Sequence, residues 1–134
     1  MLSVNKSKNI ILYSYTQRSG VRPFGISVLI AGFDNDKQPK LYLSEPSGAL
    51  AAWQATAIGR SSDKAIELLE KSWEPEMHYQ KGIKLVVETM LGYVEAGSKN
   101  LEVAVIFPGE EMTILKDEEV DKLIMEIEEK KKEK

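Results

Sequence analysis

The sequence of 134 residues contains no cysteine and a single histidine. The lack of cysteine excludes disulfide bonds, thiolate metal sites and a cysteine nucleophile, and it fits a reducing compartment. The histidine, His78, has no partner histidine, and no serine lies in a Gly-x-Ser-x-Gly sequence. A Ser-His-Asp triad is therefore not indicated, and we expect His78 to be an exposed surface residue rather than a general base.

Long apolar runs and a strong net charge are absent too. The apolar patch Ile10–Leu12 is far shorter than a signal-peptide core or a membrane span, so we expect no membrane partner. The formal net charge is −3 and basic residues are dispersed except in the final EEKKKEK, which argues against a nucleic-acid partner. With 43% apolar and 29% charged residues, the chain has the composition of one globular domain.

The first part of the chain is patterned as strands separated by turns. Ile26–Phe33 is a continuous apolar run rich in β-branched residues, which predicts a strand covered on both faces. Lys40–Leu43 follows the polar turn DNDKQP. Ala49–Ile58 follows the turn sequence SEPSG and gives a third candidate strand, although its alanines also suit a helix.

The apolar period changes to that of a helix after Gly59. Ser61 or Ser62 is placed to cap this helix. Its apolar stripe comprises Ala65, Ile66, Leu69 and Trp73. The spacing predicts a helix with one buried face.

Pro75 ends that helix, and a second helical pattern covers His78–Ala96, with Gly97 as its expected stop.

Leu101–Phe107 and Met112–Leu115 flank the turn PGEE, which predicts an antiparallel hairpin.

Asp117 is expected to cap a last helix, in which acids come first and lysines last, as the helix dipole prefers. The apolar face of this helix comprises Val120, Leu123, Ile124 and Ile127. Strands and helices are thus segregated along the chain rather than alternating. The sequence predicts an α+β fold with mostly antiparallel sheets and flanking helices.

The glycines of RSGVRPFG suggest a phosphate-binding loop at first sight. Gly20 and Gly25 flank Arg22, but no Gly-Lys-Ser/Thr follows, and a strand rather than a helix comes next. Neither a P-loop nor a dinucleotide fingerprint is therefore present. Because Pro23 biases Arg22 toward extended backbone, we interpret the segment as a stiff entry into the strand.

Other residues with reactive groups have structural interpretations. Ser47 lies between Pro46 and Gly48, which are typical of a β-turn. Three acids lie among lysines on the last helix, which favours a solvated face over a metal site. They are Glu126, Glu128 and Glu129. Three methionines fit core filling better than a ligand set. They are Met77, Met90 and Met112.

Three segments together resemble the second half of proteasome α-type subunits. They are YTQRSGVRPFGISVLIAGF, SEPSGALAAWQATAIGRSSDKAIELLEK and LEVAVI. The resemblance runs in family order from Tyr15 to the last helix. We therefore expect a non-family leader over residues 1–14 and a partial α-subunit domain over residues 15–134. Trp53 beside QATAIG and the ending MTILKDEEVDKLIMEIE look most like the type-2 α subunit.

The motif residues that carry the resemblance are expected to be structural, and none is expected to be catalytic. They are Tyr15, Thr16, Gln17, Gly20, Val21, Arg22, Pro23, Phe24, Gly25, Pro46, Ser47, Gly48, Ala55, Thr56, Ala57 and Gly59. Two departures from the family pattern are Ser19, where a second glycine is usual, and Ala49–Leu50, which replaces a more aromatic stretch.

The resemblance implies an αββα sandwich of the N-terminal-nucleophile hydrolase type, in which helices cover two sheets. Family α subunits carry no active threonine. They form hetero-heptameric or homo-heptameric rings, contact β subunits and seat regulatory caps. The resulting threonine-type endopeptidase complex serves ubiquitin-dependent protein degradation in the cytoplasm and nucleus. The resemblance thus implies a non-catalytic structural subunit of the 20S core, without cofactor or metal.

The resemblance also leads us to expect an N-terminally truncated form. The gating tail, the first strands, the first long helix and most of the second helix of the family are not matched. Unpaired sheet edges and uncovered apolar faces attract other chains. We therefore expect the isolated polypeptide to self-associate or to fold incompletely.

Two other functions stay open. One is an N-terminal-nucleophile hydrolase whose nucleophile is unidentified, and the other is an α+β adaptor that binds peptides by strand addition. Gly97–Ser98 is the only place where serine or threonine follows glycine. Cleavage there would discard the three leading strands and two helices, so self-activation is not expected.

Overall fold

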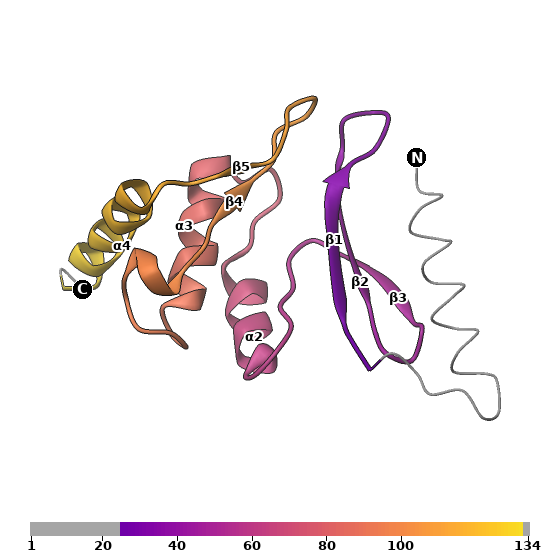
Figure 1. Cartoon of the computed structure of the whole chain (residues 1–134), viewed down its shortest axis with the longest axis horizontal. Coiled ribbons are helices and arrows are strands. Elements are labelled where there is room, and N and C mark those ends of the chain that lie inside the picture. Colours follow the sequence, from indigo (N-terminus) through magenta and orange to yellow (C-terminus); the bar gives the residue numbers. More distant parts are fainter. Residues whose placement is uncertain (1–24, 133–134) are drawn as a thin grey trace. The chain divides into compact units, whose positions relative to one another are not determined.

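A computed structural model describes residues 25–132 of the chain, which divides into two units, Met1–Ile58 and Gly59–Lys134. The described part of the first unit is a three-stranded antiparallel sheet, and the second unit holds helices and a two-stranded hairpin (Figure 1). The α+β class with antiparallel sheets and helices is confirmed.

Two short turns join the strands of the first unit, whose order in the sheet is β1-β2-β3. Both pairs are antiparallel and their registers run without a bulge. This meander follows from apolar runs broken by turn residues at DNDKQP and EPSG. The strands are β1 (Val28–Phe33), β2 (Pro39–Ser44) and β3 (Leu50–Trp53).

Two expectations for this sheet need correction. The third strand stops at Trp53 instead of continuing to Ile58. The first strand is not covered on both faces, because the Leu29 side chain is 38% exposed and no helix of the first unit packs on it within residues 25–58. Burial in the sheet centres on the end of β2, where Leu43 and Ser44 are buried.

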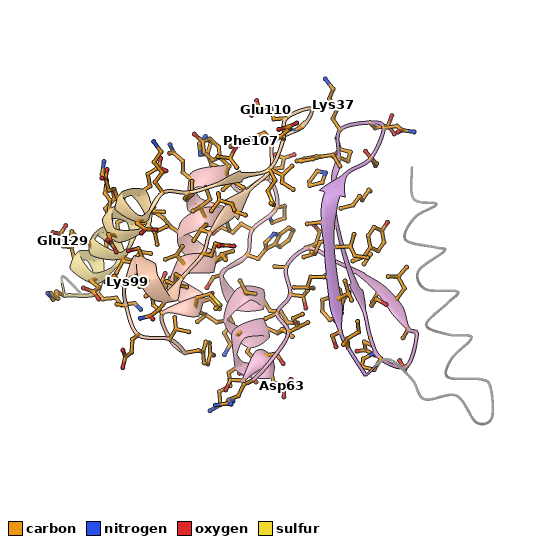
Figure 2. The ribbon with its side chains drawn as sticks, viewed as in Figure 1. Lys37, Asp63, Lys99, Phe107, Glu110 and Glu129 are labelled. Atoms are coloured by element: carbon orange, nitrogen blue, oxygen red, sulfur yellow. The ribbon has the colours of Figure 1, made fainter. Side chains whose placement is uncertain are left out.

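In the second unit, α3 contacts both α2 and α4, and η1 contacts α4. The hairpin precedes α4, and the Leu115 N–H donates to the Val103 carbonyl at its base, at 2.8 Å. Figure 2 shows Phe107 and Glu110 at the tip of this hairpin. The elements are α2 (Ser62–Ser72), α3 (Tyr79–Met90), η1 (Ser98–Asn100), β4 (Ala104–Val105), β5 (Thr113–Ile114) and α4 (Asp117–Lys132).

The helices begin differently from the expected caps. Ser61 occupies the N-cap of α2, but its backbone is left-handed at φ 63° and its side chain makes no capping bond. Asp117 is the first residue of α4, and the residue before it, Lys116, accepts the first helical hydrogen bonds. The Glu119 carboxylate accepts the Lys116 N–H at 2.9 Å, which is one half of a capping box.

The second helix is shorter than its apolar pattern predicts. It ends at Met90, and Gly92 and Tyr93 then donate to carbonyls three residues earlier, so the last turn tightens. Glycine has a low helix propensity, so Gly92 favours an end well before Ala96, although α3 accommodates Gly82 nearer its start. Gly97, at φ 144°, precedes η1 instead of stopping α3.

The core of the second unit forms where α3, α4 and the segment before β4 meet. Its buried members are Val87, Leu101, Val120, Ile124 and Ile127, of which Val87 and Val120 are almost completely buried. The apolar face predicted for α4 therefore supplies three of them. Two methionines do not fill this core as expected, since Met90 is 40% exposed and Met112 is 57% exposed. Neither belongs to the buried cluster or to the partly buried hydrophobic residues packed against it.

Candidate functional site

The turn between β1 and β2 is built around the carboxylate of Asp34. Its Oδ1 accepts the N–H groups of Gln38, at 2.8 Å, and Asp36, at 3.0 Å. The Lys40 ammonium lies 3.5 Å from Oδ2. The hydrogen bond from the Gln38 N–H is the main cause that holds the pKa of the Asp34 carboxyl below its ordinary value of 3.8. Burial opposes this effect, while Lys40 and the Asp36 N–H add to it. Asp34 therefore closes this hairpin through an Asx turn.

The turn between β2 and β3 contains the motif residues Pro46, Ser47 and Gly48. The Glu45 N–H donates to the Ala49 carbonyl and the Gly48 N–H to the Glu45 carbonyl, both at 2.9 Å. The Ser47 hydroxyl accepts the Ala49 N–H at 3.3 Å. The predicted turn is confirmed, and the Ser47 hydroxyl is engaged inside it rather than aimed at a substrate.

Gly25, the first described residue, has φ 69°, and the other described motif residues lie at the end of the first unit and the start of the second. Ala55, Thr56 and Ala57 are half-buried, and the Thr56 hydroxyl oxygen is buried without a hydrogen-bond partner in the described part of the chain. Gly59 has φ 103°, a conformation that favours glycine. Motif positions 15–24, including Arg22 and Pro23, lie outside the described residues.

Ser98 is tied to α4 by two hydrogen bonds. Its backbone N–H donates to Asp121 Oδ1 at 2.9 Å, and its hydroxyl donates to Asp121 Oδ2 at 3.1 Å. Asp121 lies on α4, so the bonds fix η1 against that helix. The only serine that follows a glycine is thus a structural anchor, and its hydroxyl proton is committed to a carboxylate.

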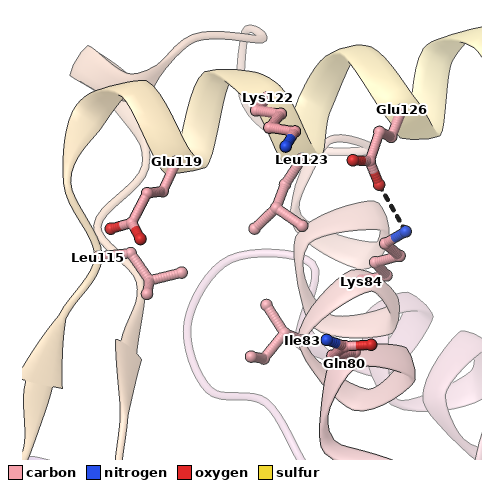
Figure 3. A pocket seen from close by; sticks show the side chains of 8 residues that line it. All are labelled: Gln80, Ile83, Lys84, Leu115, Glu119, Lys122, Leu123 and Glu126. Atoms are coloured by element: carbon pink, nitrogen blue, oxygen red, sulfur yellow. Dashed lines mark ion pairs between the residues drawn. The ribbon is translucent and has the colours of Figure 1, made fainter.

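A surface groove lies between α3, α4 and the residue after β5 (Figure 3). Its volume is about 460 Å³. Three apolar side chains point into it, and polar side chains of both helices surround them. The lining residues are Gln80, Ile83, Lys84, Leu115, Glu119, Lys122, Leu123 and Glu126.

The charges at this groove are largely balanced within it. Lys84 on α3 forms an ion pair with Glu126 on α4, drawn as the dashed line in Figure 3. Lys84, and to a lesser extent Lys122, holds the pKa of the Glu126 carboxyl below its ordinary value of 4.5. Glu126 therefore links two helices, while its side chain stays 39% exposed at the surface.

None of the eight groove residues is a serine, threonine, cysteine, histidine or tyrosine, so the groove offers no hydroxyl, thiol or imidazole nucleophile. His78 is exposed beside α3 as expected, and its ring lies 4.6 Å from that of Tyr79, centroid to centroid.

Over residues 25–132, no three histidine, aspartate or glutamate side chains converge to hold a metal ion. Within the same range, no helix has the length and apolarity needed to cross a bilayer.

Sequence reasoning missed Asp34, Asp121 and the partnership of Glu126. The DNDK turn was a usable signal for Asp34, since an aspartate opening a turn often accepts later N–H groups. Ser98 and Asp121 are 23 residues apart in the chain, and no local pattern marks their pairing.

Comparison with known proteins places this chain among proteasome subunits. Residues 6–106 match the family described as Proteasome subunit. The match begins at residue 6, ahead of the boundary expected at Tyr15. The expected division into a leader over residues 1–14 and an α-subunit domain from residue 15 stays a prediction.

Several relatives share this similarity. The chain is 48% identical over 117 residues to proteasome subunit alpha type-7 of Dictyostelium discoideum, covering 87% of this chain and 46% of that protein. It is 45% identical over 121 residues to proteasome subunit alpha type-4 of Saccharomyces cerevisiae, covering 87% and 48%. It is 43% identical over 121 residues to proteasome subunit alpha type-7-like of Macaca fascicularis, covering 89% and 48%.

The chain spans about half the length of these relatives. Their names are type-7 and type-4, so the expected type-2 likeness is not confirmed. All three are α-type subunits, and the family match covers most of the chain. This chain belongs to the proteasome subunit family, and within it to the α-type subunits.

Proposed function

We propose that this chain acts as a non-catalytic structural subunit of the α ring of a 20S proteasome. The observation that carries the proposal is its similarity, across 87% of its length, to relatives named as α-type subunits. Because these relatives are named type-7 and type-4, the proposal favours the ring position of a type-7 or type-4 subunit over that of a type-2 subunit. Its partners are neighbouring α subunits and β subunits, and regulatory caps bind the assembled ring.

The same proposal places the chain in a threonine-type endopeptidase complex to which other subunits supply the nucleophile. It acts there in ubiquitin-dependent degradation, in the cytoplasm and nucleus. The hydrogen bond from the Ser98 hydroxyl to Asp121, which fixes η1 to α4, supports a structural role for this serine. The Ser47 hydroxyl is held in the β2–β3 turn.

Co-purification tests the assembly. The tagged full-length chain, expressed in eukaryotic cells, is expected to elute with α and β subunits in one particle of 20S size. A Val87→Asp variant places a charge at a side chain that is 0% exposed, so it is expected to be lost from the particle. Glu128→Gln, at an exposed position of α4, is the matched control and is expected to remain. Recovery of the wild-type chain free of all other subunits would refute the proposal.

Active-site labelling separates the proposed subunit from a hydrolase. A threonine-directed electrophile is expected to label β subunits of the purified particle and to leave this chain unmodified. An adduct on this chain, located by peptide mass spectrometry, would replace the structural function with a catalytic one.

A further inference from the structure

A second groove of the second unit lies between the end of α2, the first turns of α3 and the last turns of α4. Its volume is about 480 Å³. Lysines outnumber acids among the side chains that line it, and we call it the lysine groove. Its charged residues are Lys81, Lys84, Glu88, Glu126, Lys130 and Lys131. The lysine groove is therefore positively charged in a chain whose formal net charge is −3.

Both acids of the lysine groove already have a lysine partner inside it. Lys84 forms an ion pair with Glu126, and the Lys131 ammonium lies 3.7 Å from the Glu88 carboxylate. Lys130, in contrast, forms no ion pair with any residue in the range 25–132. Its charge is not neutralised within this part of the chain, and this favours an anionic ligand beside it.

Lys81 has its ion-pair partner outside the groove. It pairs with Glu74, which lies on the link between α2 and α3, and the two side chains are 57% and 63% exposed. Exposed pairs of this kind contribute little to stability. A carboxylate of a ligand can therefore replace Glu74 as the partner of Lys81 with little loss.

Apolar side chains line the same groove between the lysines. Ile127 belongs to the buried core of the unit, and Met77 and Leu85 are half-buried. The Met77 sulfur lies 4.0 Å from the position that a Cβ at Gly82 would take, so Met77 packs closely against α3. A ligand with both an apolar side chain and carboxylates fits such a surface better than a small anion does.

The lysine groove lies on the side of α3 that is turned away from its exposed apolar side chains. Lys81, Leu85 and Glu88 share one face of this helix, because they follow each other at spacings of four and three residues. Val86 and Met90, which are 52% and 40% exposed, lie on the opposite face. A layer that covered Val86 and Met90 would leave the lysine groove open. Access to the groove therefore does not depend on what packs on the apolar face.

We propose that the lysine groove binds an acidic peptide segment of a partner protein, in which carboxylates flank one large apolar side chain. The apolar side chain packs on Met77 and Leu85, one carboxylate pairs with Lys130, and another pairs with Lys81. Charge complementarity selects this ligand over a neutral or basic segment. The inference goes beyond membership of the α ring and does not require it.

A nucleic-acid strand fits the lysine groove less well than an acidic peptide. Glu88 and Glu126 would face its evenly spaced phosphates and repel them. None of the described residues that line the groove is aromatic, so bases would have no side chain on which to stack. A peptide can place its carboxylates beside Lys81 and Lys130 and an apolar side chain between them.

Fluorescence anisotropy tests the charge complementarity with the full-length chain and a short labelled peptide of glutamates with one central leucine. Lys130→Glu replaces an attraction by a repulsion and is expected to weaken binding about fivefold to tenfold. Lys132→Glu makes the same change of charge in the same turn of α4, outside the groove lining, and is expected to weaken binding less than about twofold. Equal losses in the two variants, or no binding by the wild-type chain, would overturn the proposal.

Variants of the peptide test the two parts of the ligand separately. Replacing its glutamates by glutamines is expected to abolish measurable binding. Replacing the leucine by serine is expected to weaken binding about tenfold, through the lost apolar contact with Met77 and Leu85. A single-stranded oligonucleotide of equal charge is expected to bind more weakly than the peptide. Tighter binding of the oligonucleotide, or unchanged binding of the serine peptide, would contradict the assigned ligand.

Photocrosslinking locates the bound peptide without relying on any variant of the chain. A benzophenone group in place of the leucine is expected to attach to segments that contain Met77 or Leu85, as identified by mass spectrometry. An excess of unlabelled peptide is expected to suppress the product. Attachment confined to the β1–β3 sheet or to the β4–β5 hairpin would place the binding site elsewhere and refute the proposal.

Discussion

Ser98 and Asp121 are joined by two hydrogen bonds, from the Ser98 N–H to Oδ1 at 2.9 Å and from its hydroxyl to Oδ2 at 3.1 Å. The pair fixes η1 to α4 across 23 positions of sequence. Such bonds to an ionised acceptor are stronger than those between neutral groups. The Gly97–Ser98 peptide bond therefore lies next to a residue that holds η1 against α4.

Removing this carboxylate is expected to destabilise the chain. Asp121→Ala leaves the Ser98 N–H and hydroxyl unpaired and is expected to lower the free energy of unfolding by about 1–3 kcal/mol. Ser98→Ala loses only the hydroxyl bond and costs about 1 kcal/mol. Urea denaturation measures both, with exposed Lys99→Ala as the control near zero. Additive effects of the double variant would show that the two residues do not interact.

Two adjacent valines of α3 provide a test of the core assignment. Val87 is 0% exposed and contacts the α4 cluster, whereas Val86 is 52% exposed. Val87→Ala is expected to cost about 2 kcal/mol through lost burial and the cavity left behind. Val86→Ala is expected to change the free energy of unfolding by less than about 0.5 kcal/mol. Similar losses at the two positions would mean that α3 is rotated from the orientation described.

Periodicity predicted the elements of this chain better than it predicted their ends. The apolar faces of α2 and α4 were recognised because buried positions on a helix recur with its own period. The end of α3 was missed because its apolar pattern continues past Met90, while Gly92 lowers the helix propensity there. Capping by Glu119 was missed because Asp117 is the more usual cap residue.

Tertiary pairings left no signal in the sequence pattern. Lys84 and Glu126 look like ordinary surface residues of two separate helices, and only the packing of α3 on α4 brings them together. The same holds for Ser98 and Asp121. Family motifs were recognisable by resemblance, yet those at residues 15–24 lie outside the described structure, so their roles stay predictions.

The β1–β2 turn is expected to weaken in acid. The pKa of Asp34 lies below its ordinary value of 3.8 in the folded chain, so its contribution is fully present above that value. It is lost as the pH falls below 3.8 through the lowered folded pKa. Amide exchange of Gln38 over this range measures the loss, with Asp36→Asn as the control. Asp34→Asn keeps an acceptor oxygen but no titratable group, so a pH response that persists in this variant would exclude Asp34 as its source.

The groove between α3 and α4 supplies a second titration. Lys84→Met is expected to raise the pKa of Glu126 toward its ordinary value of 4.5, because Lys84 is the main cause of the lowered value. Lys130→Met removes a weaker influence and is expected to have a smaller effect. Carboxyl carbon NMR shifts of Glu126 report both. An unchanged pKa in Lys84→Met would mean that the ion pair does not persist in solution, as many exposed pairs do not.

Two glycines of the sheet are expected to respond oppositely to alanine. Gly48 lies in the β2–β3 turn at φ 85°, where a Cβ costs about 1–2 kcal/mol, so Gly48→Ala should lower the free energy of unfolding by that amount. Gly32 lies in β1, and its φ angle is not positive. A Cβ added at Gly32 would have no other heavy atom within 4 Å. Gly32→Ala is therefore expected to be neutral or to stabilise by up to about 1 kcal/mol, through a less flexible unfolded chain. If thermal melts gave equal losses for both variants, the cost would come from side-chain volume, and the left-handed turn at Gly48 would not be its cause.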